Sequence, residues 1–175
     1  DFKTATSADF ATDVEAGVAY LLTRKEIDKK KIGLIGHSEG GIIAPMVAAK
    51  TKGVSFIVLM AGTGIPGDQL LLLQATMIGR AAGVSEEDLE KTRSINRGAY
   101  DLVIQSTEEL NNELTAYMTA YIEQVLKDDP AQSLPEGTTI EQVVKVQVDG
   151  LISPWMQYFI KYDPSIILEK VKCPV

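Results

Sequence analysis

One short stretch of the chain has residue types and spacing suited to nucleophilic chemistry, Gly36-His37-Ser38-Glu39-Gly40. It follows an apolar run at 31–35 and precedes a helical pattern that begins at Gly41. A G-x-S-x-G sequence between a strand and a helix is typical of a nucleophile elbow, a strained turn that presents a serine hydroxyl. The turn is expected to bring Gly36 and Gly40 almost into contact, where only hydrogen fits. The sequence therefore predicts Ser38 as a nucleophile within a turn formed by Gly36, His37, Gly40 and Gly41.

The single histidine of the chain limits what this motif can do alone. A serine hydroxyl needs a general base, usually a histidine that a carboxylate orients. His37 directly precedes Ser38, and consecutive residues leaving a strand point to opposite faces. We therefore favour a packing role for His37 beneath the turn over a catalytic role. The base of a catalytic Ser38 is then expected outside these 175 residues.

Two carboxylates near the motif have simple structural interpretations. The Glu39 side chain suits the first turn of a helix, where the dipole favours negative charge. A contact between Glu39 and the amine of a substrate is the alternative. Asp68 is a candidate for the orienting carboxylate, but a helix-capping role explains it more simply.

Composition indicates a folded domain and disfavours several partners. Apolar residues make up 45% and charged residues 23% of the chain, and the formal net charge is -7. That charge disfavours nucleic acid and anionic membrane as partners, because both require clustered Lys and Arg. Cys173 is the only cysteine, which gives no disulfide framework and no thiolate metal site. No metal or cofactor is predicted, and the compartment, cytoplasmic or exported, stays open.

The secondary structure predicted around Ser38 is a parallel crossover. Ser7 is expected to cap a helix that leads to a strand at 31–35. After the turn, a helix containing Pro45 connects to a continuous apolar run at 54–60, a pattern typical of a strand buried on both faces. Strand, helix and strand at this spacing form a right-handed parallel unit.

Beyond a glycine- and proline-rich segment at 61–67, the strand signal disappears for about a hundred residues. Capping residues there predict helices that begin near Asp68, Ser85, Ser106, Thr138, Ser153 and Asp163. Residues 171–175 resemble the entrance to a further strand. We predict an α/β fold, a partial parallel sheet with an inserted all-helical cap. The expected parts are a core at 1–62, a cap at 63–161 and a return to the core at 162–175.

Aromatic residues of the predicted cap are candidates for substrate contacts. Tyr117, Met118 and Tyr121 share one helical face, for which plain core packing is favoured over a substrate channel. Trp155 and Tyr158 lie just before the chain returns to the core. A role in the wall of a substrate pocket and simple packing are both open for these two residues.

Two stretches carry a family resemblance. Asp9-Phe10-Ala11-Thr12-Asp13, followed by the residues from Ile32 to Gly41, resemble the middle of an α/β-hydrolase, closest to bacterial esterases and serine-aminopeptidase-like enzymes with a helical lid. Residues 153–175 resemble the segment that returns from lid to sheet. The resemblance implies Ser38 as nucleophile and the Glu39 backbone N–H as an oxyanion donor. It also implies a second donor upstream of Asp1, and the acid and histidine of the triad downstream of Val175.

The expected function is that of a serine hydrolase cleaving a small-molecule ester, thioester or peptide bond through an acyl-enzyme on Ser38. This stretch alone is expected to be an inactive fragment, and to self-associate through uncovered sheet edges and helix faces. The alternative is a noncatalytic binding module of the same fold. A coincidental turn at the motif is the third interpretation.

Overall fold

The structure, a computed structural model, describes residues 3–128 and 133–175. Asp1 and Phe2 of the predicted core and residues 129–132 of the predicted cap lie outside the described residues. The chain divides into two compact units. The sheet unit comprises Asp1–Leu70 and Tyr162–Val175, and the helical unit comprises Leu71–Lys161. In the chain, the helical unit is therefore inserted between two segments of the sheet unit.

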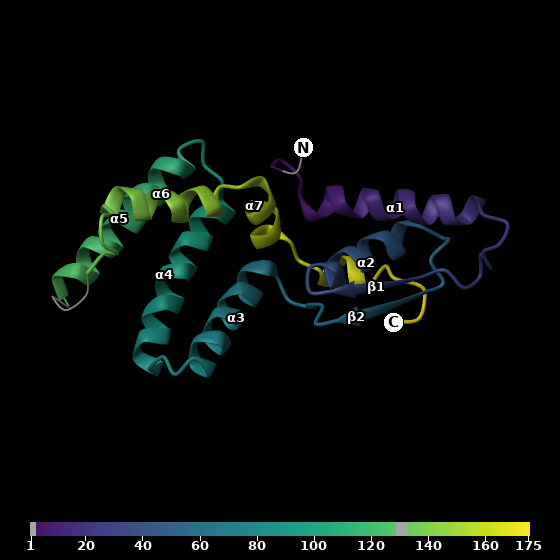
Figure 1. The fold of residues 1–175 in the computed structure, drawn as a ribbon, viewed down its shortest axis with the longest axis horizontal. Helices are drawn as coiled ribbons and strands as arrows, with labels where there is room; N and C mark the ends of the chain where they lie inside the picture. Colours follow the sequence, from purple (N-terminus) through teal and green to yellow (C-terminus); the bar gives the residue numbers. More distant parts are fainter. Residues whose placement is uncertain (1–2, 129–132) are drawn as a thin grey trace. The chain divides into compact units, whose positions relative to one another are not determined.

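The sheet unit contains two parallel strands and the helices that accompany them (Figure 1). Its elements are α1 (Ser7–Thr23), β1 (Gly33–His37), α2 (Gly40–Lys50), β2 (Phe56–Met60) and α8 (Ser165–Leu168). The register places Gly33 opposite Phe56 and His37 opposite Met60. Helix α2 connects the two strands, so the predicted parallel crossover is confirmed, and the small parallel sheet agrees with the predicted α/β character.

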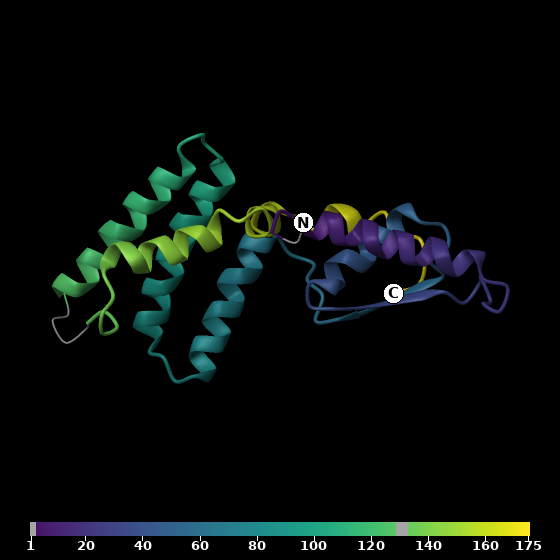
Figure 2. The same cartoon turned by 45° about the horizontal axis from the view of Figure 1, so that its top comes forward.

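Helices α1 and α2 lie on the same side of the sheet, as the two views agree (Figures 1 and 2). Side chains alternate between the faces of a strand, and Ile57, on the covered face of β2, is only 2% exposed. Phe56, Val58 and Met60 point to the other face and are 40%, 41% and 52% exposed. The prediction that this strand is buried on both faces is therefore wrong, because no helix of the described sheet unit covers its second face.

The residue that caps helix α1 lies one position before the residue expected to do so. Thr6, not Ser7, is the N-cap, and it forms a capping box with Asp9. The backbone N–H of Thr6 donates to Asp9 Oδ2 at 2.8 Å, and the Asp9 N–H donates to Thr6 Oγ1 at 3.4 Å. Ser7 is the first helical residue and is only 1% exposed. Its hydroxyl is therefore available for a contact outside its own helix.

The C-terminal segment lies beside the sheet without forming a strand. No strand is present at 171–175, contrary to the expected strand entrance. The backbone N–H of Ile57 nevertheless donates to the carbonyl oxygen of Pro174 at 2.9 Å. This hydrogen bond links the segment to β2.

In its described residues, 71–128 and 133–161, the helical unit has five helices that pack around an apolar core. They are α3 (Gly67–Ala81, whose first residues belong to the sheet unit), α4 (Glu86–Gln105), α5 (Leu110–Asp128), α6 (Ile140–Leu151) and α7 (Pro154–Lys161). Ser85 caps α4 as predicted, and Thr139 caps α6. Asp68 lies in the first turn of α3 and is buried, and its capping role stays a prediction.

Four of the helices contribute to the core of this unit. The buried residues are Ile95, Ala99, Val103, Leu110, Leu114, Met118, Val144, Val148 and Ile160. Met118 therefore belongs to the core, as favoured for its helical face. No helix among the described residues is both long enough and apolar enough to span a bilayer.

Candidate active site

Ser38 occupies a tight turn between β1 and α2. Its φ angle is +53°, in the left-handed region, which costs a residue with a Cβ about 1–2 kcal/mol. The backbone N–H of Ser38 donates to the carbonyl oxygen of Met60, and its own carbonyl accepts from the N–H of Gly41, both at 2.9 Å. Ser38 is exposed. The turn therefore holds an accessible serine at the carboxyl end of a parallel strand, in a strained conformation of the kind that concentrates at functional sites.

Close backbone approaches explain two of the three glycines of this turn. A Cβ on Gly36 would lie 1.9 Å from the carbonyl oxygen of Gly40, and one on Gly41 would lie 2.5 Å from the Cα of Gly62. Gly40 itself has no neighbour within 4 Å of an added Cβ. Gly36 and Gly40 thus lie close together as expected, but the contact excludes a side chain only at Gly36. At Gly40 there is room for one. The approach of Gly41 to Gly62, just after β2, was not predicted, because it joins two separate strand ends.

Glu39 lies at the start of α2 and is bound to α1. Its φ and ψ angles are -56° and -34°, within the helical region. The hydroxyl of Ser7 donates a hydrogen bond to Glu39 Oε1 at 2.6 Å. A contact across 32 residues has no local sequence signal, so the sequence could not reveal it.

His37 is the last residue of β1 and is exposed. The prediction that it packs beneath the turn is therefore wrong. His37 alternates with Gly36 along the strand and shares the uncovered face with Ile35, which is 72% exposed. It is the only histidine of the chain, so a second histidine as general base would have to come from another polypeptide segment.

Ser106 is a second serine with a φ of +53°, but its surroundings differ. It follows α4 as the C-cap, and its hydroxyl donates to the carbonyl oxygen of Val103 at 3.0 Å. The ammonium group of Lys161 contacts the Ser106 hydroxyl oxygen. A cation near the carboxyl end of a helix is favourable, so this pair has a structural explanation.

Trp155 and Tyr158 belong to α7 in the helical unit, whereas Ser38 belongs to the sheet unit. Both aromatic residues are half-buried. The Trp155 ring packs against Phe159 at a centroid distance of 5.6 Å. Packing is therefore observed for Trp155, and a role of either residue in a substrate pocket stays a prediction.

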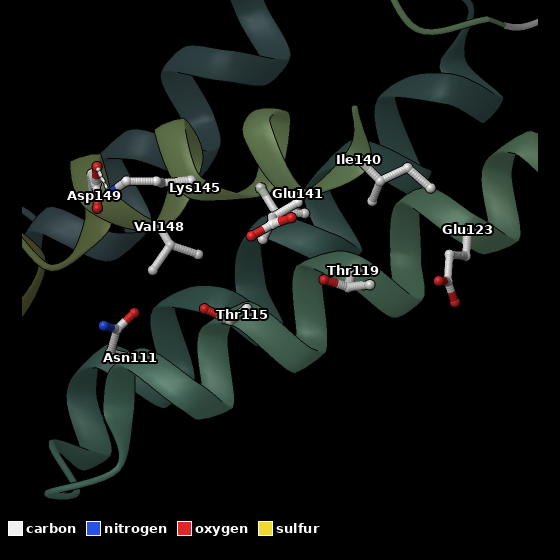
Figure 3. A pocket seen from close by; sticks show the side chains of 10 residues that line it. Asn111, Thr115, Thr119, Glu123, Ile140, Glu141, Lys145, Val148 and Asp149 are labelled. Atoms are coloured by element: carbon white, nitrogen blue, oxygen red, sulfur yellow. Dashed lines mark hydrogen bonds and ion pairs between the residues drawn. The ribbon is translucent and has the colours of Figure 1, made fainter. Parts of the chain in front are cut away.

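A polar groove of about 470 Å³ lies between α5 and α6 in the helical unit (Figure 3). Thr115 and Thr119 lie along one wall, and Lys145 and Asp149 on the other form an ion pair at 2.7 Å. Among the described residues, no group of His, Cys, Asp and Glu side chains is arranged to hold a metal ion. The groove therefore offers hydrogen bonds and an ion pair, but no nucleophile with a base.

A second cavity, of about 390 Å³, lies among α4, α5 and α6 and is more aromatic. Met118 and Tyr121 of α5 line it together with Tyr100. Burial raises the pKa of the Tyr100 hydroxyl, so this group stays protonated at neutral pH. Ser38 lines neither of these two cavities.

The sheet unit has a parallel strand pair and a strained serine turn between β1 and α2, and the family that the sequence matches belongs to the α/β-hydrolase-like group. The family model described as "BAAT / Acyl-CoA thioester hydrolase C terminal" matches residues 14–134. Because this match covers more than half of the chain, the chain belongs to that family. The matched range includes Ser38 and its turn and extends through α5 of the helical unit. No curated protein and no solved structure matches the chain.

Proposed function

We propose that this chain carries the nucleophile of a serine-dependent acyl hydrolase, with Ser38 as the attacking residue. The observation that carries the proposal is the exposed Ser38 at φ +53° between a parallel strand and a helix. The serine of a nucleophile elbow lies in this kind of strand-to-helix turn, which supports the proposal. Among esters, thioesters and peptides, we favour a thioester substrate, because the matching family is described as an acyl-CoA thioester hydrolase.

In the proposed reaction, the Ser38 Oγ forms a bond to the carbonyl carbon of the thioester while a base outside this chain accepts the hydroxyl proton. The Glu39 backbone N–H is proposed as one donor to the developing oxyanion. The dipole of α2 favours negative charge at the same point. Collapse of the intermediate breaks the carbon–sulfur bond, and the thiolate leaves with the proton from the base. Water then attacks the acyl-enzyme, releasing the carboxylic acid and restoring Ser38.

The triad acid, its histidine and the second oxyanion donor are proposed to lie in segments of a longer polypeptide. The helical unit is proposed to serve that polypeptide as a lid, with Trp155 and Tyr158 in the wall of the substrate site. Without a base, the serine loses several orders of magnitude in rate. This chain alone is therefore expected to hydrolyse substrate very slowly.

A fluorophosphonate probe, which labels activated serines, tests the proposal when it is applied both to the full-length polypeptide and to this chain alone. The full-length polypeptide should be labelled at Ser38, and a Ser38→Ala variant should not be labelled. This chain alone should react far more slowly. Ser106 supplies an internal comparison, because it has the same φ of +53° without the strand-to-helix setting. Labelling of neither form at Ser38 would contradict the proposal.

The second candidate is a noncatalytic binding module, favoured by the position of the only histidine. His37 shares the uncovered sheet face with Ile35 and directly precedes Ser38. If no base is supplied by any other segment, the protein can still bind a ligand but does not turn it over. Binding of an acyl thioester without release of thiol by the full-length polypeptide would support this candidate.

This chain alone is also proposed to self-associate through the uncovered face of its sheet. Ile35, Phe56, Val58 and Met60 are all at least 40% exposed there. Parallel sheets are normally covered on both faces, and a contiguous exposed apolar patch favours association. A second copy of the same uncharged face is a suitable cover.

A further inference from the structure

Ser7, at the start of α1, has a buried hydroxyl that contacts the side chain of Glu39, the residue after Ser38. Ser7 is 1% exposed, and its Oγ donates to Glu39 Oε1 at 2.6 Å. Hydrogen bonds from a hydroxyl to a carboxylate are shorter and stronger than those between neutral groups. The pair joins two helices that are consecutive in the chain but separated by β1.

Capping of α1 does not explain this hydroxyl. Thr6 and Asp9 already form the capping box at that end of the helix. A buried hydroxyl nearly always has a hydrogen-bond partner, and for Ser7 the partner is a side chain 32 residues away. The contact therefore ties α1 to the beginning of α2.

The residue that Ser7 holds directly follows the proposed nucleophile. Rotation of Glu39 would turn the peptide unit between Ser38 and Glu39, and that unit carries the proposed oxyanion donor. Donors act in catalysis only when they are preorganised toward the position of the oxyanion. The Gly41 N–H already holds the carbonyl oxygen of this peptide unit at 2.9 Å, and fixing the Glu39 side chain at its far end adds a second restraint beside the N–H. The contact also gives one carboxylate oxygen of Glu39 a partner within the protein, which weakens the alternative that Glu39 binds a substrate amine.

We propose that Ser7 is a positioning residue that acts through the Glu39 carboxylate to hold the Glu39 backbone N–H toward the reacting carbonyl group. This inference rests on the proposed function of Ser38. Ser7 touches no reacting atom. Its effect is expected in the transition state, where the oxyanion forms, and not in the binding of the substrate.

The test uses the full-length polypeptide with Ser7→Ala and the nearly isosteric Ser7→Cys, whose thiol is a weak donor. Thioester hydrolysis is measured per active serine, with active serines counted by fluorophosphonate labelling. Both variants should lower kcat about tenfold and leave KM unchanged, less than the 10²–10³ lost when an oxyanion donor is removed outright. Thr12→Ala is the matched control, because Thr12 is an exposed hydroxyl residue of α1 that donates to Asp9 O. It should leave kcat unchanged.

A double-mutant cycle separates positioning from general destabilisation. Ser7→Ala combined with Glu39→Met should lower kcat no further than Glu39→Met alone, because both changes break the same contact. An unchanged kcat per active serine in Ser7→Ala and Ser7→Cys, even with fewer active serines, would overturn the inference and leave the role of Ser38 intact. Absence of Ser38 labelling in the unmodified protein would overturn the proposed function, and this inference with it.

Discussion

The backbone N–H of Ser38 donates to the carbonyl oxygen of Met60 at 2.9 Å. This hydrogen bond extends the pairing of β1 and β2 by one step beyond His37 and Met60. The strained serine is therefore fastened to the neighbouring strand on one side and to α2, through Gly41, on the other. A turn held at both ends keeps a serine at φ +53° without a glycine at that position.

The close approach at Gly36 predicts that substitution of Gly36 lowers stability much more than substitution of Gly40. Gly36→Ala places a Cβ 1.9 Å from the Gly40 carbonyl oxygen, which forces the backbone to move and should lower the free energy of unfolding by about 2–4 kcal/mol. Gly40→Ala meets no atom within 4 Å and should change stability by less than about 1 kcal/mol. Urea unfolding measures both variants. Equal losses would contradict the geometry.

Ala61 is expected to be the easiest site at which to stabilise the sheet unit. It follows β2 with a φ of +53°, so Ala61→Gly removes the clash of a Cβ in the left-handed region and should raise stability by about 0.5–1 kcal/mol. Ala16→Gly, in the exposed interior of α1, should lower stability by a similar amount. Thermal unfolding of the two variants should therefore shift Tm in opposite directions. A lower Tm for Ala61→Gly would contradict this prediction.

The ion pair between Arg80 and Glu86 predicts that the contribution of Glu86 to stability depends on pH. Arg80 Nε and Nη2 donate to the two Glu86 oxygens at 2.6 and 2.7 Å, and these hydrogen bonds hold the pKa of the Glu86 carboxyl below its usual range. A lowered folded-state pKa contributes stability above the unfolded-state pKa, and this is lost as pH falls through the folded value. In Arg80→Gln, NMR titration should show the pKa of Glu86 rising. The pKa of Glu26, which hydrogen bonds from its own backbone N–H and from the Arg24 side chain lower, should not change.

We expect Leu114 to contribute strongly to the stability of the helical unit. It is 0% exposed within the core of that unit, so Leu114→Ala should cost about 2–5 kcal/mol. Leu73→Ala, at a leucine that is 50% exposed, should cost less than about 1 kcal/mol. Trp155, the only tryptophan of the chain, lies in the same unit and reports its unfolding by fluorescence. A small effect of Leu114→Ala would contradict the assigned core.

The uncovered sheet face predicts concentration-dependent association of this chain. Val58→Glu introduces a charge in the middle of that face and should shift the sedimentation profile toward the monomer. Ile166→Glu is the control, because Ile166 is 58% exposed in α8, outside the strands. Association that survives Val58→Glu but is lost in Ile166→Glu would show that another surface is responsible.

Local patterns were sufficient to predict the parallel unit and most helix starts. Periodicity and capping rules apply to features whose interactions span only a few residues. Such features are the apolar runs, the glycines around Ser38 and the caps at Ser85 and Thr139. The family match at residues 14–134 supports the hydrolase resemblance in its broad form. It does not distinguish the esterase or aminopeptidase subgroup.

Burial and long-range contacts were not predictable in the same way. His37 and β2 were expected to be covered, but burial depends on which elements pack against a face and not on the composition of the strand. Ser7 was expected to be a cap, because a serine at a helix start has that preference. Its contact with Glu39 depends on the packing of α1 against α2, which no local pattern encodes.

The central claim is that Ser38 accepts an acyl group, and trapping that group tests it most directly. The full-length polypeptide is mixed with an acyl thioester, quenched in acid within the first turnover, digested and analysed by mass spectrometry. We predict one acyl group per protein, esterified to Ser38 and appearing together with an equal amount of free thiol, and no acyl group in Ser38→Ala. An acyl group on a different residue, or thiol release that persists in Ser38→Ala, would contradict it.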